Sequence, residues 1–195
     1  MAPAVGTRER LLDEALDLFT RQGYEATSLQ QLADRLGVTK AAIYYHFRSK
    51  RDILSALVEP MMDDLARRMD RAECGQSVST PAMLADYVDF LISQRRVIQF
   101  AHQDISWLGE MPELLARNVE LRGRLIALLA GKNLSLDAQV RVTVALTGVQ
   151  GALAVHVDAD PAALRSALLD AIGSLLEPVR RKATGTTPRS AGLAR

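Results

Sequence analysis

Residues 35–51 combine basic and aromatic side chains in a pattern that suits contact with a nucleic acid. Positive charge attracts phosphate groups and releases the counterions condensed around DNA, and tyrosine or histidine side chains among the charges can hydrogen-bond phosphates or base edges. A run of charged residues can also be an ordinary solvated helix face, but this run coincides with a helix-turn-helix pattern, described next, which favours phosphate binding. The segment contains no acidic residue, although the net charge of the 195-residue chain is only +1, and its basic residues are Arg35, Lys40, Arg48, Lys50 and Arg51.

Two short helices joined by a tight turn are expected to position these side chains. Ser28 can cap the first helix and form a capping box with Gln31, and Gly37 can end that helix in the left-handed conformation. Thr39 can cap a second helix that begins at Lys40. A helix, a turn of about three or four residues and a second helix form a helix-turn-helix, whose second helix enters the DNA major groove.

An ordered set of motifs makes residues 8–57 resemble the N-terminal DNA-binding domain of the TetR (tetracycline repressor) family of bacterial transcription regulators. The resemblance implies an all-α homodimer with a three-helix helix-turn-helix domain and a larger, divergent C-terminal helical domain for ligand binding and dimerisation. We expect domain limits of 1–52 and 53–182, with a disordered tail at 183–195. The motifs are Gln31-Leu32-Ala33, Leu36-Gly37-Val38, Ala42-Ile43-Tyr44, Tyr44-x-His46-Phe47 and Ser49-Lys50.

Roles at the DNA are assigned position by position from this resemblance. The first residues of the recognition helix are candidates for base contact: Lys40 can donate to guanine and the Ala42 methyl can touch a thymine methyl. The alternatives are that Tyr44 is half core and half contact, and that His46 buttresses the turn instead of binding phosphate. The predicted DNA-binding residues are Ser28, Thr39, Lys40, Ala42, Tyr44, Tyr45, His46 and Lys50.

The rest of the chain also favours helices. Apolar spacing predicts helices over 7–22, 97–108, 112–130 and from 161 onward, and a further helix that Thr80 caps and that begins at Pro81. Ser49 can cap a fourth helix that Pro60 should kink or break. We expect Pro60 to act as a pivot between the domains and residues 74–80 to form a linker. Residues 135–157 are ambiguous because valines at 140, 142 and 144 alternate with polar residues, but their length favours a helix.

The two C-terminal helices are expected to form the homodimer interface. Small residues at Ala145, Gly148 and Gly151 allow another helix to approach closely, and the TetR resemblance implies a four-helix bundle at this end. Packing only within their own subunit is the alternative. Residues 180–195 are basic and rich in Gly, Thr and Ser, which predicts an inert disordered tail or one that adds weak DNA attraction.

A small-molecule effector pocket is expected within the second domain, although the sequence does not identify its ligand. Apolar walls with a few polar groups favour a largely hydrophobic molecule, and each candidate residue could equally be part of the core. The candidates are Met62, Tyr87, Phe90, Gln94, His102, Gln103, Trp107, Thr147 and Gln150.

Other classes of protein are disfavoured. His102, Asp104 and His156 lack the spacing of metal ligands or of a nucleophile motif, so we expect no enzyme activity, no cofactor and no metal. A single cysteine, no signal peptide and no apolar run of about 18 residues predict a soluble, cytoplasmic protein without a membrane partner. The favoured function is a repressor that binds a palindromic DNA operator; the alternative is an activator or architectural protein without a ligand.

Overall fold

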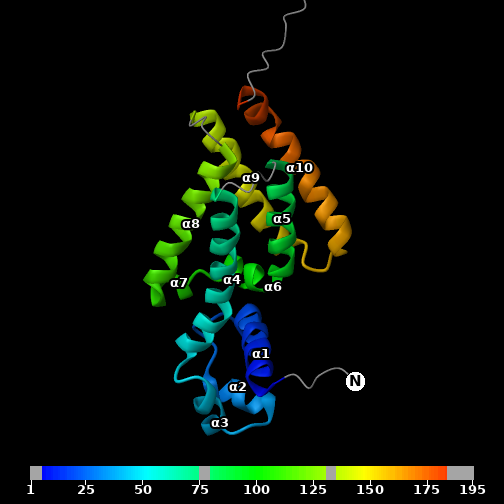
Figure 1. Cartoon of the computed structure of the whole chain (residues 1–195). Coiled ribbons are helices and arrows are strands. Elements are labelled where there is room, and N and C mark those ends of the chain that lie inside the picture. Colours follow the sequence, from blue (N-terminus) through cyan, green and yellow to red (C-terminus); the bar gives the residue numbers. More distant parts are fainter. Residues whose placement is uncertain (1–5, 75–79, 131–134, 184–195) are drawn as a thin grey trace, which may run out of the picture.

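The structure is a computed structural model that describes residues 6–74, 80–130 and 135–183, and these residues form helices and no strand (Figure 1). The all-α prediction is therefore confirmed. The helices are α1 (Thr7–Gln22), α2 (Leu29–Leu36), α3 (Lys40–His46), α4 (Lys50–Glu73), α5 (Thr80–Ser93), α6 (Arg95–Gln103), α7 (Trp107–Glu110), α8 (Pro112–Ala130), α9 (Leu136–Val155) and α10 (Pro161–Ala183).

A small head is built from α1, α2, α3 and the first turns of α4, and Figure 1 shows it at one end of the molecule. Its core holds apolar side chains that are at most 5 % exposed. Burial of each large side chain of this kind contributes about 1.5–3 kcal/mol, which fixes the relative positions of these short helices. The core residues include Leu11, Leu16, Phe19, Leu32, Ile43, Phe47, Ile53 and Leu54.

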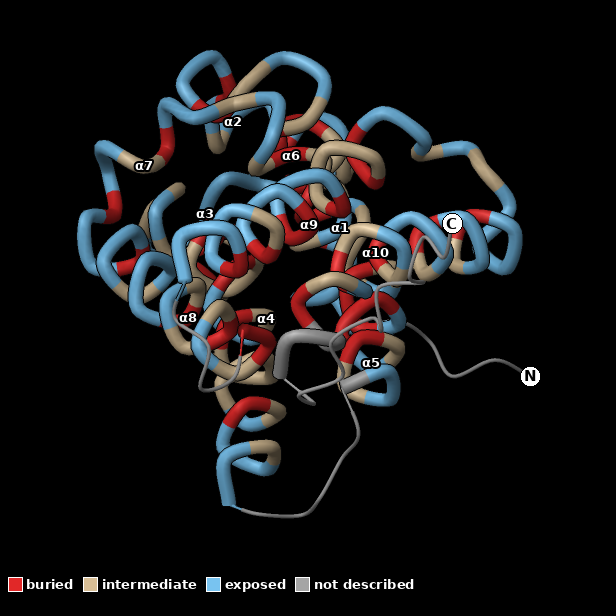
Figure 2. Tube along the Cα trace, turned by 90° about the horizontal axis from the view of Figure 1, so that it is seen from above, coloured by how far each residue is buried: buried red, intermediate tan, exposed pale blue. Residues whose placement is uncertain are grey.

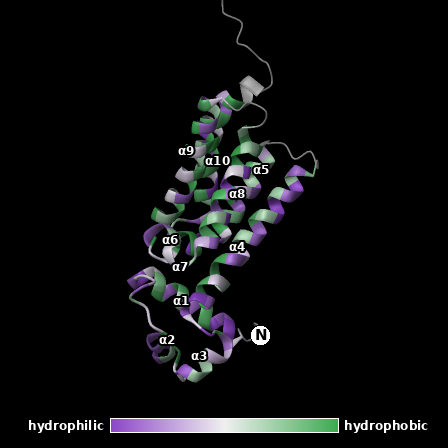
Figure 3. Cartoon of the chain, turned by 90° about the vertical axis from the view of Figure 1, so that its left-hand side faces the viewer, coloured by the Kyte–Doolittle hydropathy of each residue, from purple (hydrophilic) through white to green (hydrophobic). Residues whose placement is uncertain are grey.

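The body consists of the rest of α4 together with α5 to α10. Its central helix is α9, which packs against α5, α6, α8 and α10. Figure 2 shows the buried residues facing inward between the helices, and Figure 3 shows hydrophobic and hydrophilic residues alternating along them. Such alternation is what the 3.6-residue period of an amphipathic helix requires.

The ambiguous segment at 135–157 is a helix, as predicted. Ser135 caps α9 by accepting from the backbone N–H of Ala138 at 3.3 Å. The strand-like alternation has a helical explanation, because Val142 is buried in the body whereas Val140 and Val144 lie on the exposed side. By length and composition α9 is also apolar enough to cross a membrane, with 39 % of its apolar window buried, but it packs against four other helices as a core helix does.

One predicted helix is interrupted earlier than expected. The helix predicted over 97–108 is wrong, because α6 begins at Arg95 and ends at Gln103, and a separate α7 begins at Trp107. Asp104 interrupts it with an extended backbone, and its carboxylate accepts from the N–H groups of Tyr24 and Ser106. The linker predicted at 74–80 lies mostly outside the described residues.

Prolines inside helices are tolerated here. α4 runs through Pro60 without interruption, so the predicted break is wrong, although the first turns of α4 slant relative to its upper part in Figure 1. α10 likewise runs through Pro178 to Ala183, so residues 180–183 are helical and not part of a tail. Buried neighbours such as Val58, Met62 and Val179 hold these helices against the core, which offsets the lost backbone hydrogen bond. The predicted tail beyond residue 183 lies outside the described residues.

Candidate nucleic-acid interface

The helix-turn-helix forms through the local interactions expected from its sequence. Ser28 Oγ accepts from the backbone N–H of Gln31 at 3.2 Å, and the Gln31 side chain accepts from the Ser28 N–H at 2.8 Å. Gly37 adopts φ +66°, a conformation that favours glycine, and it ends α2. Thr39 Oγ1 then accepts from the N–H of Ala42 at 3.2 Å and starts α3. The turn between the helices is therefore fixed by caps at both ends.

One side of α3 anchors it and the other faces solvent. Ile43 and Phe47 are 0 % and 4 % exposed, whereas Tyr44 is 47 % and Tyr45 is 85 % exposed. Tyr45 buries almost none of its ring, so its presence is not explained by packing within the head. Lys40 is also exposed, and its Nζ lies 5.8 Å from the Tyr44 ring centroid, within cation–π distance. The free side of α3 thus presents a basic and aromatic surface.

Other predicted DNA-binding residues are placed less openly. Thr39 and Ser28 are exposed but use their hydroxyls as helix caps. Ala42 is half-buried on α3. His46 is half-buried, lies edge-on to Tyr45 at 5.1 Å, and lines an open groove of about 540 Å³ between the head and α4. These positions bring Thr39, Lys40, Tyr44 and Tyr45 together at the exposed start and side of α3.

Lys50 is bound to the turn after α1 instead of standing free. Its Nζ donates to the backbone carbonyls of Tyr24 at 2.7 Å and Glu25 at 3.3 Å, and it lies 4.2 Å from the Tyr24 ring centroid. Tyr24 is held from its other side as well, because its backbone N–H donates to Asp104 Oδ2 at 2.6 Å. Lys50 therefore holds the turn after α1 to the start of α4, and Asp104 holds the same turn to the end of α6.

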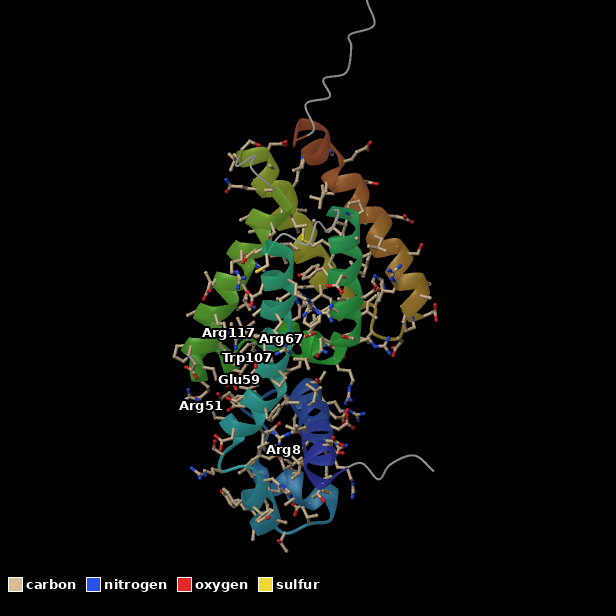
Figure 4. The ribbon with its side chains drawn as sticks, in the orientation of Figure 1. Arg8, Arg51, Glu59, Arg67, Trp107 and Arg117 are labelled. Carbon is tan, nitrogen blue, oxygen red and sulfur yellow. The ribbon has the colours of Figure 1, made fainter. Side chains whose placement is uncertain are left out.

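Acidic residues from other elements neutralise part of the basic segment. Arg35 pairs with Glu14 and with Asp17, and Arg51 pairs with Glu113 of α8. Figure 4 shows Arg51 where α4 passes from the head toward the body. Arg48 is exposed, and among the described residues no ion pair to its side chain is found, so it joins Lys40 as a free cation. Sequence reasoning noted the charge of Arg48 but omitted it from the predicted site.

The predicted effector residues are not brought together in one pocket. Tyr87 and Gln150 line the same small cavity in the body, whereas Gln94 lines a separate open hollow beside Arg95. His102, Gln103 and Thr147 are exposed, and Met62 and Phe90 are packed in the core. Trp107 is 5 % exposed, with its indole N–H unpaired within the described residues. No cluster of three or more metal-ligating side chains occurs in the described ranges.

Comparisons with known proteins agree with this geometry. A family model described as bacterial regulatory proteins, tetR family, matches residues 11–57. The HTH-type transcriptional regulator AcrR of Shigella flexneri is 49 % identical over 53 residues, which are 27 % of this chain and 25 % of AcrR. The HTH-type transcriptional repressor BepR of Brucella suis is 29 % identical over 140 residues, which are 67 % of this chain and 66 % of BepR. The chain thus spans about a quarter of the first relative and about two thirds of the second.

The whole fold also has a solved counterpart. The crystal structure of Mycobacterium smegmatis AmtR superposes with a TM-score of 0.69 over 95 % of this chain and 98 % of that one, at 24 % identity. At this identity the likeness concerns the fold alone. The head is the part of the chain with high sequence identity to known proteins, and the body shares with them its helical arrangement.

Proposed function

The chain belongs to the tetR family of bacterial regulatory proteins, and from this premise we propose that it is a cytoplasmic transcriptional repressor that binds a palindromic DNA operator as a homodimer. In this proposal α3 enters the major groove, and a small molecule bound in the body releases the protein from DNA. The relatives named above are transcriptional regulators rather than enzymes.

The observation that carries the proposal is the exposed side of α3. Tyr45 is 85 % exposed and Lys40 and Tyr44 are exposed beside it, while Ile43 holds the opposite side of the same helix in the core. Figure 1 shows α3 at the end of the molecule, away from the body. A helix that is rigidly anchored and free on its outer side can be inserted into a groove, and its tyrosine and lysine groups can bind phosphates and base edges.

A dimer is supported by the apolar surface that α9 leaves uncovered. Leu136, Val140 and Val144 follow each other at four-residue spacing and are 77 %, 50 % and 53 % exposed. The neighbouring α10 exposes the small residues Ala163 and Ala167, which allow close approach of another helix. A second copy packed on both helices would bury this surface and present two heads to successive half-sites.

A selection of binding sites from random duplex DNA tests the proposal. We expect the purified protein to enrich an inverted repeat whose half-sites are one helical turn apart, about 34 Å. The triple variant Lys40→Ala, Tyr44→Ala, Tyr45→Ala should enrich nothing, and the variant Glu120→Ala, changed at an exposed position of α8, should enrich the same repeat as the unmodified protein. No enrichment by the unmodified protein, or a consensus without symmetry, contradicts the proposal.

A further inference from the structure

Two small cavities lie next to Tyr87, one between α4, α5 and α8 and the other between α4, α5, α8 and α9. Each has a volume of about 30 Å³, and both are lined by Leu65, Tyr87 and Leu125. Tyr87 is 5 % exposed, so its buried side chain is a wall that the two cavities share. The first cavity is mostly apolar and its wall includes Met69, Met83 and Leu128. The second has polar groups on its wall, namely Asn118, Arg122 and Gln150.

Arg122 differs from its neighbours on α8 in lacking an acidic partner. Arg117 pairs with Asp63 at 2.5 Å, and Arg124 pairs with Asp70 at 2.6 Å and Glu73 at 2.7 Å. The half-buried Arg122 donates from Nη2 to Gln150 Oε1 at 3.2 Å, and no carboxylate in the described part of the chain lies within ion-pair distance of it. A neutral amide leaves its positive charge uncompensated at the cavity wall.

The charges around the apolar cavity, by contrast, are already balanced. Arg68 and Asp86 line that cavity, but they pair with each other at 2.5 Å. An anion therefore gains nothing from the apolar side, whereas at the polar side it meets a cation that would otherwise be partly desolvated without a counter-charge.

Tyr87 adds a hydrogen-bond donor beside Arg122. Burial raises the pKa of Tyr87 to about 12, while a hydrogen bond with Gln150 and the charge of Arg122 act in the opposite direction. The phenol is therefore protonated at neutral pH and can donate to an oxygen anion. A planar guanidinium, a phenol and an amide that line one small space match the acceptor geometry of a carboxylate.

We propose, on the basis of the function proposed above, that the effector is a carboxylic acid with an apolar chain or ring. Its carboxylate binds Arg122 and Tyr87, and its apolar part occupies the cavity lined by Met69 and Met83. Each cavity has room for about one water molecule, whereas ligand sites usually measure about 300 Å³ or more. Binding therefore requires Tyr87 to swing aside and the flexible methionines to rearrange.

This requirement connects the ligand to the DNA-binding head. Leu65 and Met69, which line the cavities, belong to α4, and the first turns of the same helix are part of the head. A carboxylic acid bound between α4 and α8 favours a conformation in which α4 has moved relative to α8. Since ligand and operator then prefer different positions of α4, each weakens binding of the other.

Calorimetric titration of the DNA-free protein tests the ligand class directly. The probes are dodecanoate and 2-naphthylacetate, each compared with its neutral methyl ester. We expect an acid to bind and to raise the thermal midpoint, and its ester to bind at least about tenfold more weakly, because an ester removes the charge-assisted hydrogen bonds.

Variants at the polar cavity identify the binding groups. Arg122→Gln should weaken binding of the acid about tenfold or more and abolish the preference for acid over ester, and Tyr87→Phe, which preserves the packed ring, should weaken it several-fold. Glu120→Gln, changed two residues away at an exposed position of the same helix, is the matched control and should bind as the unmodified protein does.

Three outcomes overturn the inference: neither acid binds the unmodified protein, acid and ester bind equally well, or Arg122→Gln keeps the full affinity. None of these results depends on DNA. Failure of the proposed function is seen separately, as the absence of an enriched inverted repeat, so the two proposals can fail independently.

Discussion

At the scale of single residues, α3 separates side chains that fold the head from those available for contact. We expect Tyr45→Ala to change the free energy of unfolding by no more than about 0.5 kcal/mol, because an 85 % exposed side chain has little packing to lose. Affinity for the selected operator should fall about tenfold as a phosphate or base contact disappears. Urea unfolding and fluorescence anisotropy measure the two effects, and unchanged affinity would exclude Tyr45 from the interface.

A buried neighbour gives the comparison for that experiment. Ile43→Ala should lower the free energy of unfolding by about 2–5 kcal/mol, since Ile43 is 0 % exposed and a cavity remains where its side chain was removed. A variant of this type loses DNA affinity through unfolding of the head, and its thermal midpoint shows that loss. Tyr45→Ala should keep its thermal midpoint.

The two basic residues at the start of α4 should respond differently to substitution. Arg48→Ala should reduce the salt dependence of operator binding by about one phosphate contact, because its charge is exposed to solvent. Lys50→Ala should instead lower the thermal midpoint, since its Nζ holds the carbonyls of Tyr24 and Glu25. Salt titrations of operator binding by both variants check the assignment. A reduced salt dependence for Lys50→Ala alone would instead assign the phosphate contact to Lys50.

At the scale of elements, the joint between α1 and α6 depends on one carboxylate. Asp104 accepts from the N–H groups of Tyr24 at 2.6 Å and Ser106 at 2.8 Å. Gly23, which precedes Tyr24, has φ +90°, a conformation that glycine allows. Burial acts to raise the pKa of Asp104, but the hydrogen bonds from Ser106 and Tyr24 and the charge of Lys50 lower it overall, below its ordinary value.

This joint predicts a dependence of stability on pH. A carboxyl group with a lowered pKa in the folded protein stabilises the fold fully above its unfolded pKa of about 3.9, and the contribution is lost as pH falls through the lower folded value. Asp104→Asn should therefore cost about 1 kcal/mol at pH 7 and flatten the loss of stability below about pH 4. Urea unfolding across this range measures both, with the exposed Asp158→Asn as control. An equal pH dependence in both variants would contradict the assignment.

These joints also explain which features the sequence could predict. The caps at Ser28, Thr39 and Ser49 and the left-handed Gly37 act over three or four residues, so their spacing in the sequence was sufficient. The contact from Tyr24 to Asp104 joins residues 80 positions apart, and no local pattern marks it. The prediction of one continuous helix over 97–108 was wrong for that reason. The predicted effector residues do not share one pocket, because a helical pattern does not show which neighbouring helix each face will contact.

At the scale of the whole molecule, α9 is both a core helix of the subunit and part of the proposed dimer interface. The helix has a mean hydropathy of 1.2 over a window of which 39 % is buried, and its buried side meets four other helices. Leu136, Val140 and Val144 are exposed on its other side. In the dimer proposed above, a second copy covers this apolar stripe, and the two-fold symmetry doubles the number of DNA-binding heads.

Two exposed valines allow this last point to be tested within one molecule. Val144 on α9 is 53 % exposed and Val119 on α8 is 63 % exposed, so an arginine at either position can reach water and should leave the subunit folded. Val144→Arg should convert the dimer to a monomer in light scattering, because two like charges would be buried at the two-fold interface, and operator affinity should fall at least about a hundredfold as one head is lost from each complex. Val119→Arg should remain a dimer with full affinity. A dimeric Val144→Arg, or a monomeric Val119→Arg, would move the interface from α9 and α10 to another surface.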